Sequence, residues 1–311
     1  MHREEGGERC ALVFDVGGSH VSAALCQVCD LRLGPVVSAA HSGVQDCAGF
    51  VDLLYRLGAE AAEGRPRPLG AMLAVPGPFD FQAGASLMRH KLPYLYGIDL
   101  RQALAVRFGW QPAQVRFLND ADAYLLGELS AGAARGFTRA AGLTLGTGIG
   151  SAFAVDGRLV TEGAGVPQGG EIWNLPYEGG IVEDFISSRA ISASYQRRTG
   201  KSREVADLAA AAPADRAAQD AFTEFGQHLG RVLGTLLAAF TPDVAVLGGG
   251  ISRSAHLFLD ATRSRLTGSS LQLRVSELGA RAPLVGCGAA FSDGRGLSPA
   301  AESNFTQSAA T

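Results

Sequence analysis

Three glycine-rich segments, each directly after an apolar run, are the clearest chemical signal in the sequence. They are residues 15–20 (DVGGSH), 146–150 (GTGIG) and 248–250 (GGG). Glycine lets the backbone approach a ligand closely, and successive N–H groups in such turns bind phosphate. None of the three matches the Walker or dinucleotide-binding patterns, and each alone is equally typical of an ordinary tight turn. The presence of all three in one chain favours a ligand that carries phosphate groups.

Asp15 ends the first apolar run and opens the first glycine turn. Phosphates repel a neighbouring carboxylate unless a cation lies between them. We therefore expect Asp15 to hold Mg²⁺, either directly or through bound waters. The alternative is an ordinary turn aspartate, which would have no ligand.

The dipeptide Asn119-Asp120 lies between an apolar run and an Ala/Leu-rich stretch. Both residue types are preferred caps of helix N-termini, and a cap is the simpler interpretation. The positive end of a helix also favours an ionised carboxylate. Phosphoryl transfer needs such a carboxylate to orient the attacking hydroxyl and take its proton. Asp120 is thus a candidate general base.

These residues must be positioned by alternating strands and helices, as in an α/β protein. The apolar runs predict strands at residues 10–15, 21–28, 69–75, 115–118, 141–145, 151–155, 243–247 and 271–276. Apolar spacing of three or four predicts helices at residues 50–63, 120–134, 215–240, from about 252, and 283–291. The pattern of strand, glycine turn and strand occurs twice, which predicts two related halves.

Composition excludes several classes of protein. Among 311 residues, 47% are hydrophobic and the net charge is only −3, which argues against general disorder. The pI is near 6.1, whereas nucleic-acid-binding domains usually carry an excess of basic residues, so nucleic acid is not expected as a partner. The longest uncharged stretch, residues 140–155, is shorter than the ~20 residues of a membrane span. We expect a cytoplasmic protein with no nucleic-acid or membrane partner.

The motifs DVGGSH, VPGP, LNDADAYLLGE, LTLGTGIGSAFAVDGRLV and VAVLGGG, in this order, resemble the ROK family of sugar kinases. The resemblance implies an α/β fold of two actin-like ATPase (ribonuclease-H-like) domains with a central interdomain cleft. It places residues 1–118 and a C-terminal helix at about 288–302 in a smaller domain. Residues 119–287 would form a larger domain, and 303–311 a flexible tail.

The resemblance also assigns roles to residues. It implies ATP with Mg²⁺ as cofactor, Asp15 as the indirect Mg²⁺ ligand and Asp120 as the catalytic base. The nucleotide-binding residues would be Asp15, Gly17, Gly18, Ser19, Gly146, Thr147, Gly148, Gly249 and Gly250. The sugar-binding residues would be Gly77, Asn119, Asp120, Glu171, Asn174 and Glu183.

The sequence departs from the family pattern near Glu171. Most members have Glu-x-Gly-His and then a cysteine-rich zinc loop, whereas this chain has Trp173 and Asn174 and lacks those cysteines. We therefore expect no structural zinc, and packing of Trp173 and Tyr177 in its place. His20 stands where many members have Lys, and Lys91 where Asn is common; Lys91 would contact the sugar or face water.

The resulting expectation is an ATP-dependent kinase that phosphorylates the 6-hydroxyl of a hexose, with glucose favoured. Two alternatives stay open: a non-catalytic sugar-sensing protein of the same family, and a glucokinase that uses polyphosphate. The resemblance also suggests a homodimer.

Overall fold

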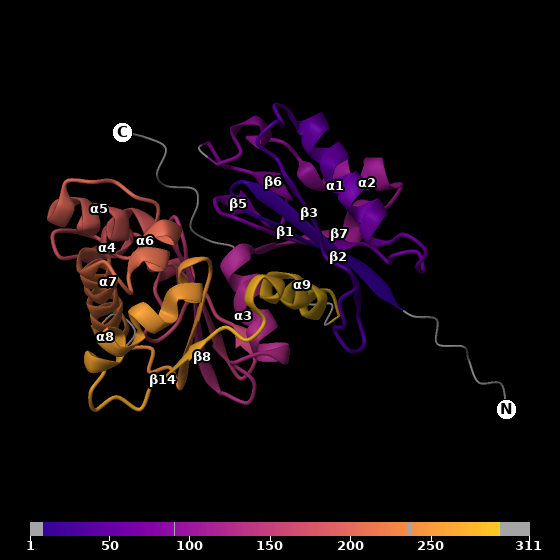
Figure 1. The fold of residues 1–311 in the computed structure, drawn as a ribbon. Coiled ribbons are helices and arrows are strands. Elements are labelled where there is room, and N and C mark those ends of the chain that lie inside the picture. The colour runs from indigo at the N-terminus through magenta and orange to yellow at the C-terminus, as the bar shows by residue number, and fades with distance from the viewer. Residues whose placement is uncertain (1–8, 90, 236–237, 293–311) are drawn as a thin grey trace, which may run out of the picture. The chain divides into compact units, whose positions relative to one another are not determined.

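The structure is a computed structural model that describes residues 9–89, 91–235 and 238–292 (Figure 1). The chain forms two compact units. Unit 1 contains residues up to Gly127 and again from Pro283, and unit 2 runs from Glu128 to Ala282. The chain thus crosses between the units after Gly127 and again after Ala282, whereas the sequence placed domain boundaries after residues 118 and 287. Residues 293–302 of the expected C-terminal helix and the expected tail 303–311 lie outside the described residues.

A mixed five-stranded sheet forms the centre of unit 1. Its strands are β1 (Cys10–Val16), β2 (His20–Gln27), β3 (Val37–Ala40), β4 (Ala71–Val75) and β7 (Val115–Asn119). Their order is β3-β2-β1-β4-β7. The first three strands are antiparallel neighbours, whereas β1, β4 and β7 run parallel. All of β4 is buried, as expected for a parallel strand covered on both faces.

Helices cover both faces of this sheet (Figure 1). They are α1 (Cys47–Ala61), α2 (Leu100–Phe108), the first turns of α3 (Asp120–Ala131), and α9 (Ala282–Ser292). Smaller elements are the β5 (Phe79–Asp80) and β6 (Ala85–Ser86) hairpin, η1 (Pro93–Leu95) and η2 (Pro112–Gln114). On one face α1 packs beside α2, and on the other α9 packs beside α3.

A second five-stranded sheet forms the centre of unit 2. Its strands are β8 (Arg139–Leu145), β9 (Ile149–Val155), β10 (Arg158–Leu159), β13 (Val244–Gly248) and β14 (Gln272–Val275). Their order is β10-β9-β8-β13-β14. Again the first three strands are antiparallel neighbours and the last three run parallel. The two units therefore share one strand topology, which confirms the two related halves predicted from the repeated turns.

The helices of unit 2 are more numerous. They are α4 (Val182–Phe185), α5 (Ser188–Thr199), α6 (Val205–Ala211), α7 (Arg216–Thr235) and α8 (Leu259–Ser264). Short elements are η3 (Gln168–Gly170), the β11 (Pro176–Tyr177) and β12 (Gly180–Ile181) hairpin, η4 (Ile251–Leu257) and η5 (Gly279–Arg281).

Two helices differ from the sequence prediction. The helix expected to reach residue 240 is described only to Thr235, and a turn occupies residues 238–240. The helix expected from about residue 252 is η4 followed by α8. Ser254 has a non-helical backbone there, with φ −102° and ψ 24°, which interrupts the helix.

Glu128 joins the end of α3 to the loop after β14. Its side chain is fully buried, and its carboxylate accepts hydrogen bonds from the Ala133 N–H at 2.7 Å and the Leu278 N–H at 3.2 Å. A buried carboxylate with several N–H partners stabilises the backbone around it. It therefore anchors unit 2 close to both points where the chain crosses from unit 1.

Candidate active site

The carboxyl ends of β1, β4 and β7 meet at one edge of the unit 1 sheet. Asp15 in β1 is the register partner of Ala74 in β4, and Asn119 in β7 is the partner of Val75. Parallel strands bring their carboxyl ends to the same edge. Asp15, the loop with Gly77, and Asn119-Asp120 are thereby brought together. We call this group the edge site of unit 1.

The two carboxylates of this edge interact electrostatically. Burial, and then the neighbouring charge of Asp120, raise the pKa of Asp15 from an ordinary value near 3.8 to about 7. The ligand-free protein therefore carries a carboxyl group that is costly to ionise. A positive charge placed beside Asp15 would offset that cost.

A magnesium ion fits this arrangement. Mg²⁺ usually binds proteins through one or two carboxylates and completes its shell with water and substrate phosphates. Across residues 9–89, 91–235 and 238–292 there is no cluster of three or more Asp, Glu, His or Cys side chains able to hold a metal alone. A magnesium ion held at Asp15 would need water and substrate phosphates to complete its shell.

Asn119 and Asp120 begin α3 in different ways. The Asn119 side-chain oxygen accepts from the Ala121 N–H at 2.9 Å and the Asp122 N–H at 3.3 Å, so Asn119 caps the helix. The Asp120 carboxylate accepts from the Ala121 N–H at 2.9 Å and is only partly buried. The cap therefore belongs to Asn119.

The first glycine turn joins β1 to β2. The Gly17 N–H donates to the His20 carbonyl at 2.9 Å, and the Ser19 hydroxyl bonds to His20 Nδ1 at 2.9 Å. His41 holds the turn by two hydrogen bonds. Its ring Nε2 lies 3.0 Å from the Gly17 carbonyl, and its backbone N–H donates to the Ser19 carbonyl. His41 is 5% exposed. A lone histidine gives no pattern in the sequence, so this positioning residue was missed.

Open space faces several of the predicted glycines. A Cβ at Gly18 or Gly77 would meet no atom within 4 Å, and one at Gly146 would meet only the Gly148 oxygen at 4.0 Å. None of these three has a positive φ. Neither the backbone conformation nor the surrounding chain therefore explains a glycine at these positions. A ligand that approaches the backbone closely would explain it.

In unit 2 the second and third glycine turns lie at one edge. Strands β8 and β13 run parallel, with Thr144 opposite Gly248. Gly249 has φ +80°, and a Cβ there would lie 2.3 Å from the Leu145 oxygen. The two backbones are thus in direct contact where the strands end. Gly146, Thr147, Gly148, Gly249 and Gly250 form the edge site of unit 2.

Glu183 lies on the second glycine turn. Its carboxylate accepts from the Ile149 N–H at 3.3 Å and pairs with Arg189 at 2.9 Å. A Cβ at Gly148 would lie 2.2 Å from the same carboxylate. Gly148 therefore makes room for Glu183. Arg189, which follows the cap Ser187 at the start of α5, was not identified from the sequence.

Glu171, Trp173 and Asn174 lie together in the loop before β11. All three are exposed, and the indole N–H of Trp173 donates to the Glu171 carboxylate at 2.9 Å. The Trp173 carbonyl accepts from the Glu183 N–H at 3.0 Å. The two glutamates predicted to bind sugar are thereby linked through one residue.

Aromatic packing holds the loop that follows Glu171. Tyr177 donates or accepts a 2.8 Å hydrogen bond with His228 Nδ1 and lies edge-on to Phe185, with ring centres 5.1 Å apart. Burial lowers the pKa of His228, which favours its neutral ring. The packing predicted for Tyr177 is therefore present. Trp173, for which packing was also predicted, is instead 40% exposed.

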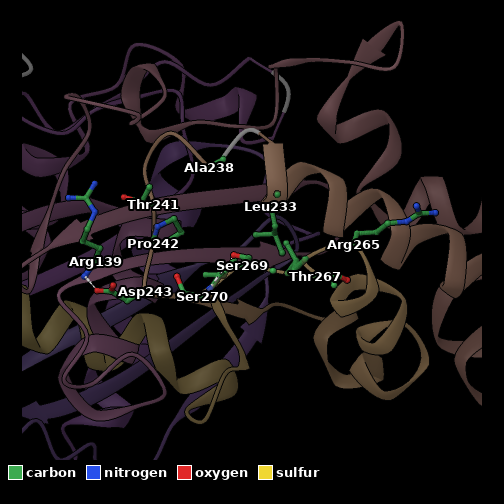
Figure 2. Close-up of a pocket in the computed structure, with 14 residues that line it drawn as sticks. Arg139, Leu233, Ala238, Thr241, Pro242, Asp243, Arg265, Thr267, Ser269 and Ser270 are labelled. Atoms are coloured by element: carbon green, nitrogen blue, oxygen red, sulfur yellow. Dashed lines mark hydrogen bonds between the residues drawn. The ribbon is translucent and has the colours of Figure 1, made fainter.

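A pocket of about 570 Å³ lies elsewhere in unit 2 (Figure 2). It surrounds the first residues of β8 and β13, at the opposite ends of those strands from the glycine turns. Arg139 on its wall already donates to the Phe240 carbonyl at 2.6 Å. Of the described residues that line it, none belongs to the predicted site, so we assign the chemistry to the strand edges.

The remaining predicted residues are less informative. His20 and Lys91 are exposed, and His20 bonds within its own turn, through its ring to Ser19 and through its carbonyl to the Gly17 N–H. No helix among the described residues is long and apolar enough to cross a bilayer. In unit 1, Asp15 and Asn119-Asp120 lie where the parallel strands end, and in unit 2 the second and third glycine turns do so.

Comparison with known proteins identifies the family. The family model described as ROK family matches residues 58–288, which is most of the chain. The chain belongs to the ROK family. The ROK hexokinase of Thermus thermophilus is similar in structure, with a TM-score of 0.74 and 26% identity over 90% of this chain and 97% of that chain. The fold expected from the resemblance, two actin-like ATPase domains, is confirmed.

Two curated ROK relatives carry names of sugar kinases. The chain is 28% identical to a glucokinase of Thermotoga maritima over 232 residues, covering 67% of this chain and 71% of the relative. It is also 28% identical to an N-acetyl-D-glucosamine kinase of Pectobacterium atrosepticum over 269 residues, covering 79% and 85%. Both relatives are named as phosphotransferases, and they differ in the acceptor sugar.

Proposed function

We propose that this ROK protein is an ATP-dependent hexose kinase that phosphorylates the 6-hydroxyl of glucose. The observation that carries the proposal is the pair Asp15 and Asp120 at the strand edge of unit 1. Asp120 begins α3 and Asp15 lies near the end of β1, both are partly buried, and the charge of Asp120 helps to raise the pKa of Asp15. Phosphoryl transfer uses these two functions: a carboxylate for the acceptor hydroxyl and a carboxylate for the metal.

Asp120 acts on the acceptor in this proposal. Its carboxylate orients the hydroxyl and takes the proton as the bond to phosphorus forms. Because the transition state of phosphoryl transfer is loose, positioning of the hydroxyl contributes more than base strength. The Asn119 amide nitrogen binds a neighbouring hydroxyl while its oxygen continues to cap α3.

Asp15 would hold Mg²⁺ through the waters of the ion. The ion supplies positive charge that offsets the negative charge of the phosphates. Binding would also favour the ionised form of Asp15, which burial alone disfavours. Bound Mg²⁺ would thus lower the pKa of Asp15 from its raised value in the ligand-free protein.

The glycine turns would bind the nucleotide. Backbone N–H groups of Gly18 and Ser19 in unit 1 and of Thr147 and Gly148 in unit 2 would donate to phosphate oxygens. The Gly17 and Gly146 N–H groups donate within their own turns, and these two glycines would shape the turns around the phosphates. Gly249 and Gly250 would lie near the adenosine. The open space in front of Gly18 and Gly146 supports this assignment.

Glu171, Asn174, Glu183 and Gly77 complete the sugar-binding set. Carboxylate oxygens accept strong hydrogen bonds from sugar hydroxyls. The carboxylate of Glu183 is held in place by Ile149 and Arg189 before any sugar binds. A pre-positioned acceptor loses less entropy on binding.

The acceptor is tested directly by a sugar panel. The purified chain is incubated with Mg²⁺ and ATP, or with polyphosphate, and with glucose, N-acetylglucosamine, N-acetylmannosamine or mannose. ADP release and the phosphorylated product are measured. We expect glucose 6-phosphate with ATP as donor. A higher kcat/KM for an N-acetylated sugar would reassign the acceptor, and turnover with polyphosphate alone would reassign the donor. No turnover with any sugar would contradict the proposal and favour a sugar sensor.

A further inference from the structure

Trp173 is an exposed tryptophan whose polar atom already has a partner. Its indole N–H donates to the Glu171 carboxylate at 2.9 Å, yet 40% of the residue is accessible to solvent. The hydrogen bond restrains the ring beside the Glu171 carboxylate. Because the indole N–H is already paired, the atoms of the ring that are left for a ligand are apolar.

Trp173 contacts Glu171 through its side chain and Glu183 through its backbone. Its indole N–H binds the Glu171 carboxylate, and its carbonyl accepts the Glu183 N–H at 3.0 Å. The Glu183 carboxylate itself lies on the glycine turn at Gly148. The chain thus places an exposed aromatic ring directly beside the Glu171 carboxylate, a group that accepts hydrogen bonds from hydroxyls.

A pyranose matches this combination of surfaces. Its ring carries hydroxyl groups around the edge and C–H groups on its faces. Aromatic rings in ligand sites bind apolar faces, and a few polar groups set the orientation. We propose that Trp173 stacks on the C–H face of the acceptor sugar and that it restricts the acceptor to uncharged pyranoses. This inference rests on the proposed function, because the sugar roles of Glu171 and Glu183 come from it.

The restriction to uncharged sugars follows from the Glu171 carboxylate. An acidic sugar stacked on Trp173 would bring its own carboxylate close to that of Glu171, which is hydrogen-bonded to the indole. Two like charges in such proximity repel. Glucose and N-acetylglucosamine fit the site, whereas glucuronic acid does not.

Tryptophan fluorescence can report this contact without turnover. The chain has two tryptophans, Trp110 and Trp173. Trp110 lies in unit 1, where its ring stacks on Phe108 with centres 4.5 Å apart. A Trp110→Phe variant keeps an aromatic ring on Phe108 and leaves Trp173 as the single fluorophore. A Trp173→Phe variant leaves only Trp110.

The titration uses glucose, N-acetylglucosamine and glucuronic acid. In Trp110→Phe we expect a saturable change in emission with at least one of the two neutral sugars, and none with glucuronic acid. In Trp173→Phe we expect no change with any of them. A change that persists in Trp173→Phe, or the same response to glucuronic acid, would overturn the inference.

Kinetics separate stacking from a structural role. We expect Trp173→Ala to raise the KM for the sugar roughly tenfold, with kcat and the KM for ATP within about threefold of the parent. Trp173→Phe should raise that KM less, because a ring remains. Trp110→Phe is the matched control and should change neither constant. An unchanged sugar KM in Trp173→Ala, or a joint fall of kcat and melting temperature, would contradict stacking.

The two proposals fail in distinguishable ways. If the wild-type chain phosphorylates no sugar, the proposed function is wrong. The fluorescence titration still decides the role of Trp173, because it needs neither ATP nor turnover.

Discussion

Asp15 is the side chain whose ionisation couples the stability of unit 1 most directly to pH. Its pKa of about 7 in the folded protein lies well above its ordinary value near 3.8. Between pH 4 and pH 7 the folded chain holds a proton that the unfolded chain releases. This contribution therefore lowers stability as the pH rises through that window and is constant above it.

Asp15→Asn should remove this pH dependence. At pH 4, where both the folded and the unfolded chain still hold much of the Asp15 proton, we expect the variant to differ little in its free energy of unfolding. At pH 8, without Mg²⁺ or nucleotide, it should be more stable than the wild type by on the order of 2 kcal/mol. Denaturant unfolding at both pH values measures the difference. An equal difference at pH 4 and pH 8 would show that Asp15 titrates normally.

Alanine should affect two glycines at the edge of unit 2 differently: ATP binding at Gly146 and stability at Gly249. Gly146→Ala places a methyl group in open space, so stability should change by less than about 1 kcal/mol while the KM for ATP rises roughly tenfold. Gly249→Ala forces a strained φ and a contact with the Leu145 oxygen, and should lower stability by about 2–3 kcal/mol. Thermal unfolding and ATP kinetics test both. An unchanged ATP KM in Gly146→Ala would exclude a close phosphate.

Some of the site could be predicted from residue types, and some could not. Asp15 and Asp120 follow apolar runs, so their meeting at one sheet edge follows from parallel strands. His41 and Arg189 act through contacts between residues far apart in the chain. A single sequence has no local pattern for such contacts, because they depend on how the elements pack.

At the scale of elements, α3 depends on its contact with α9. A Cβ at Gly286 in α9 would lie 1.8 Å from the Ala123 oxygen in α3. Backbone atoms of a helix cannot move aside as a flexible side chain can. The glycine therefore permits the two helices to pack closely, and α3 begins at the candidate base Asp120.

Gly286→Ala should disturb this packing and the site together. We expect a loss of about 2–4 kcal/mol in the free energy of unfolding and a lower kcat, because the helix that begins with Asp120 is displaced. Gly43→Ala is the matched control: a Cβ there meets no atom within 4 Å, so stability should hold. If both variants melt at the wild-type temperature, the close contact does not stabilise the fold.

The elements themselves were predicted unevenly. Central strands such as β1, β4 and β13 are nearly continuous apolar runs, because both of their faces are covered. Helices α2 and α5 were missed because their sequences are largely polar and show little apolar periodicity. They are held by caps that are clear only in the structure, such as Asp99 and Ser187.

At the scale of the whole molecule, one topology is used twice for two tasks. Both sheets have three antiparallel strands followed by two parallel ones, and both carry glycine turns at the carboxyl edge. Unit 1 adds the carboxylates Asp15 and Asp120, and unit 2 adds Glu171 and Glu183. In the proposed kinase the first pair serves the acceptor hydroxyl and Mg²⁺, and the second pair serves the binding of the sugar.

Asp120→Asn tests the central claim most directly. The amide cannot take a proton, yet it keeps the size of the side chain and the start of α3. We predict that kcat for sugar phosphorylation falls by at least about a thousandfold, while the Kd for the sugar, measured by calorimetry, stays within about threefold of the wild type. An unchanged kcat in a folded Asp120→Asn protein would contradict the assignment of Asp120 as the base.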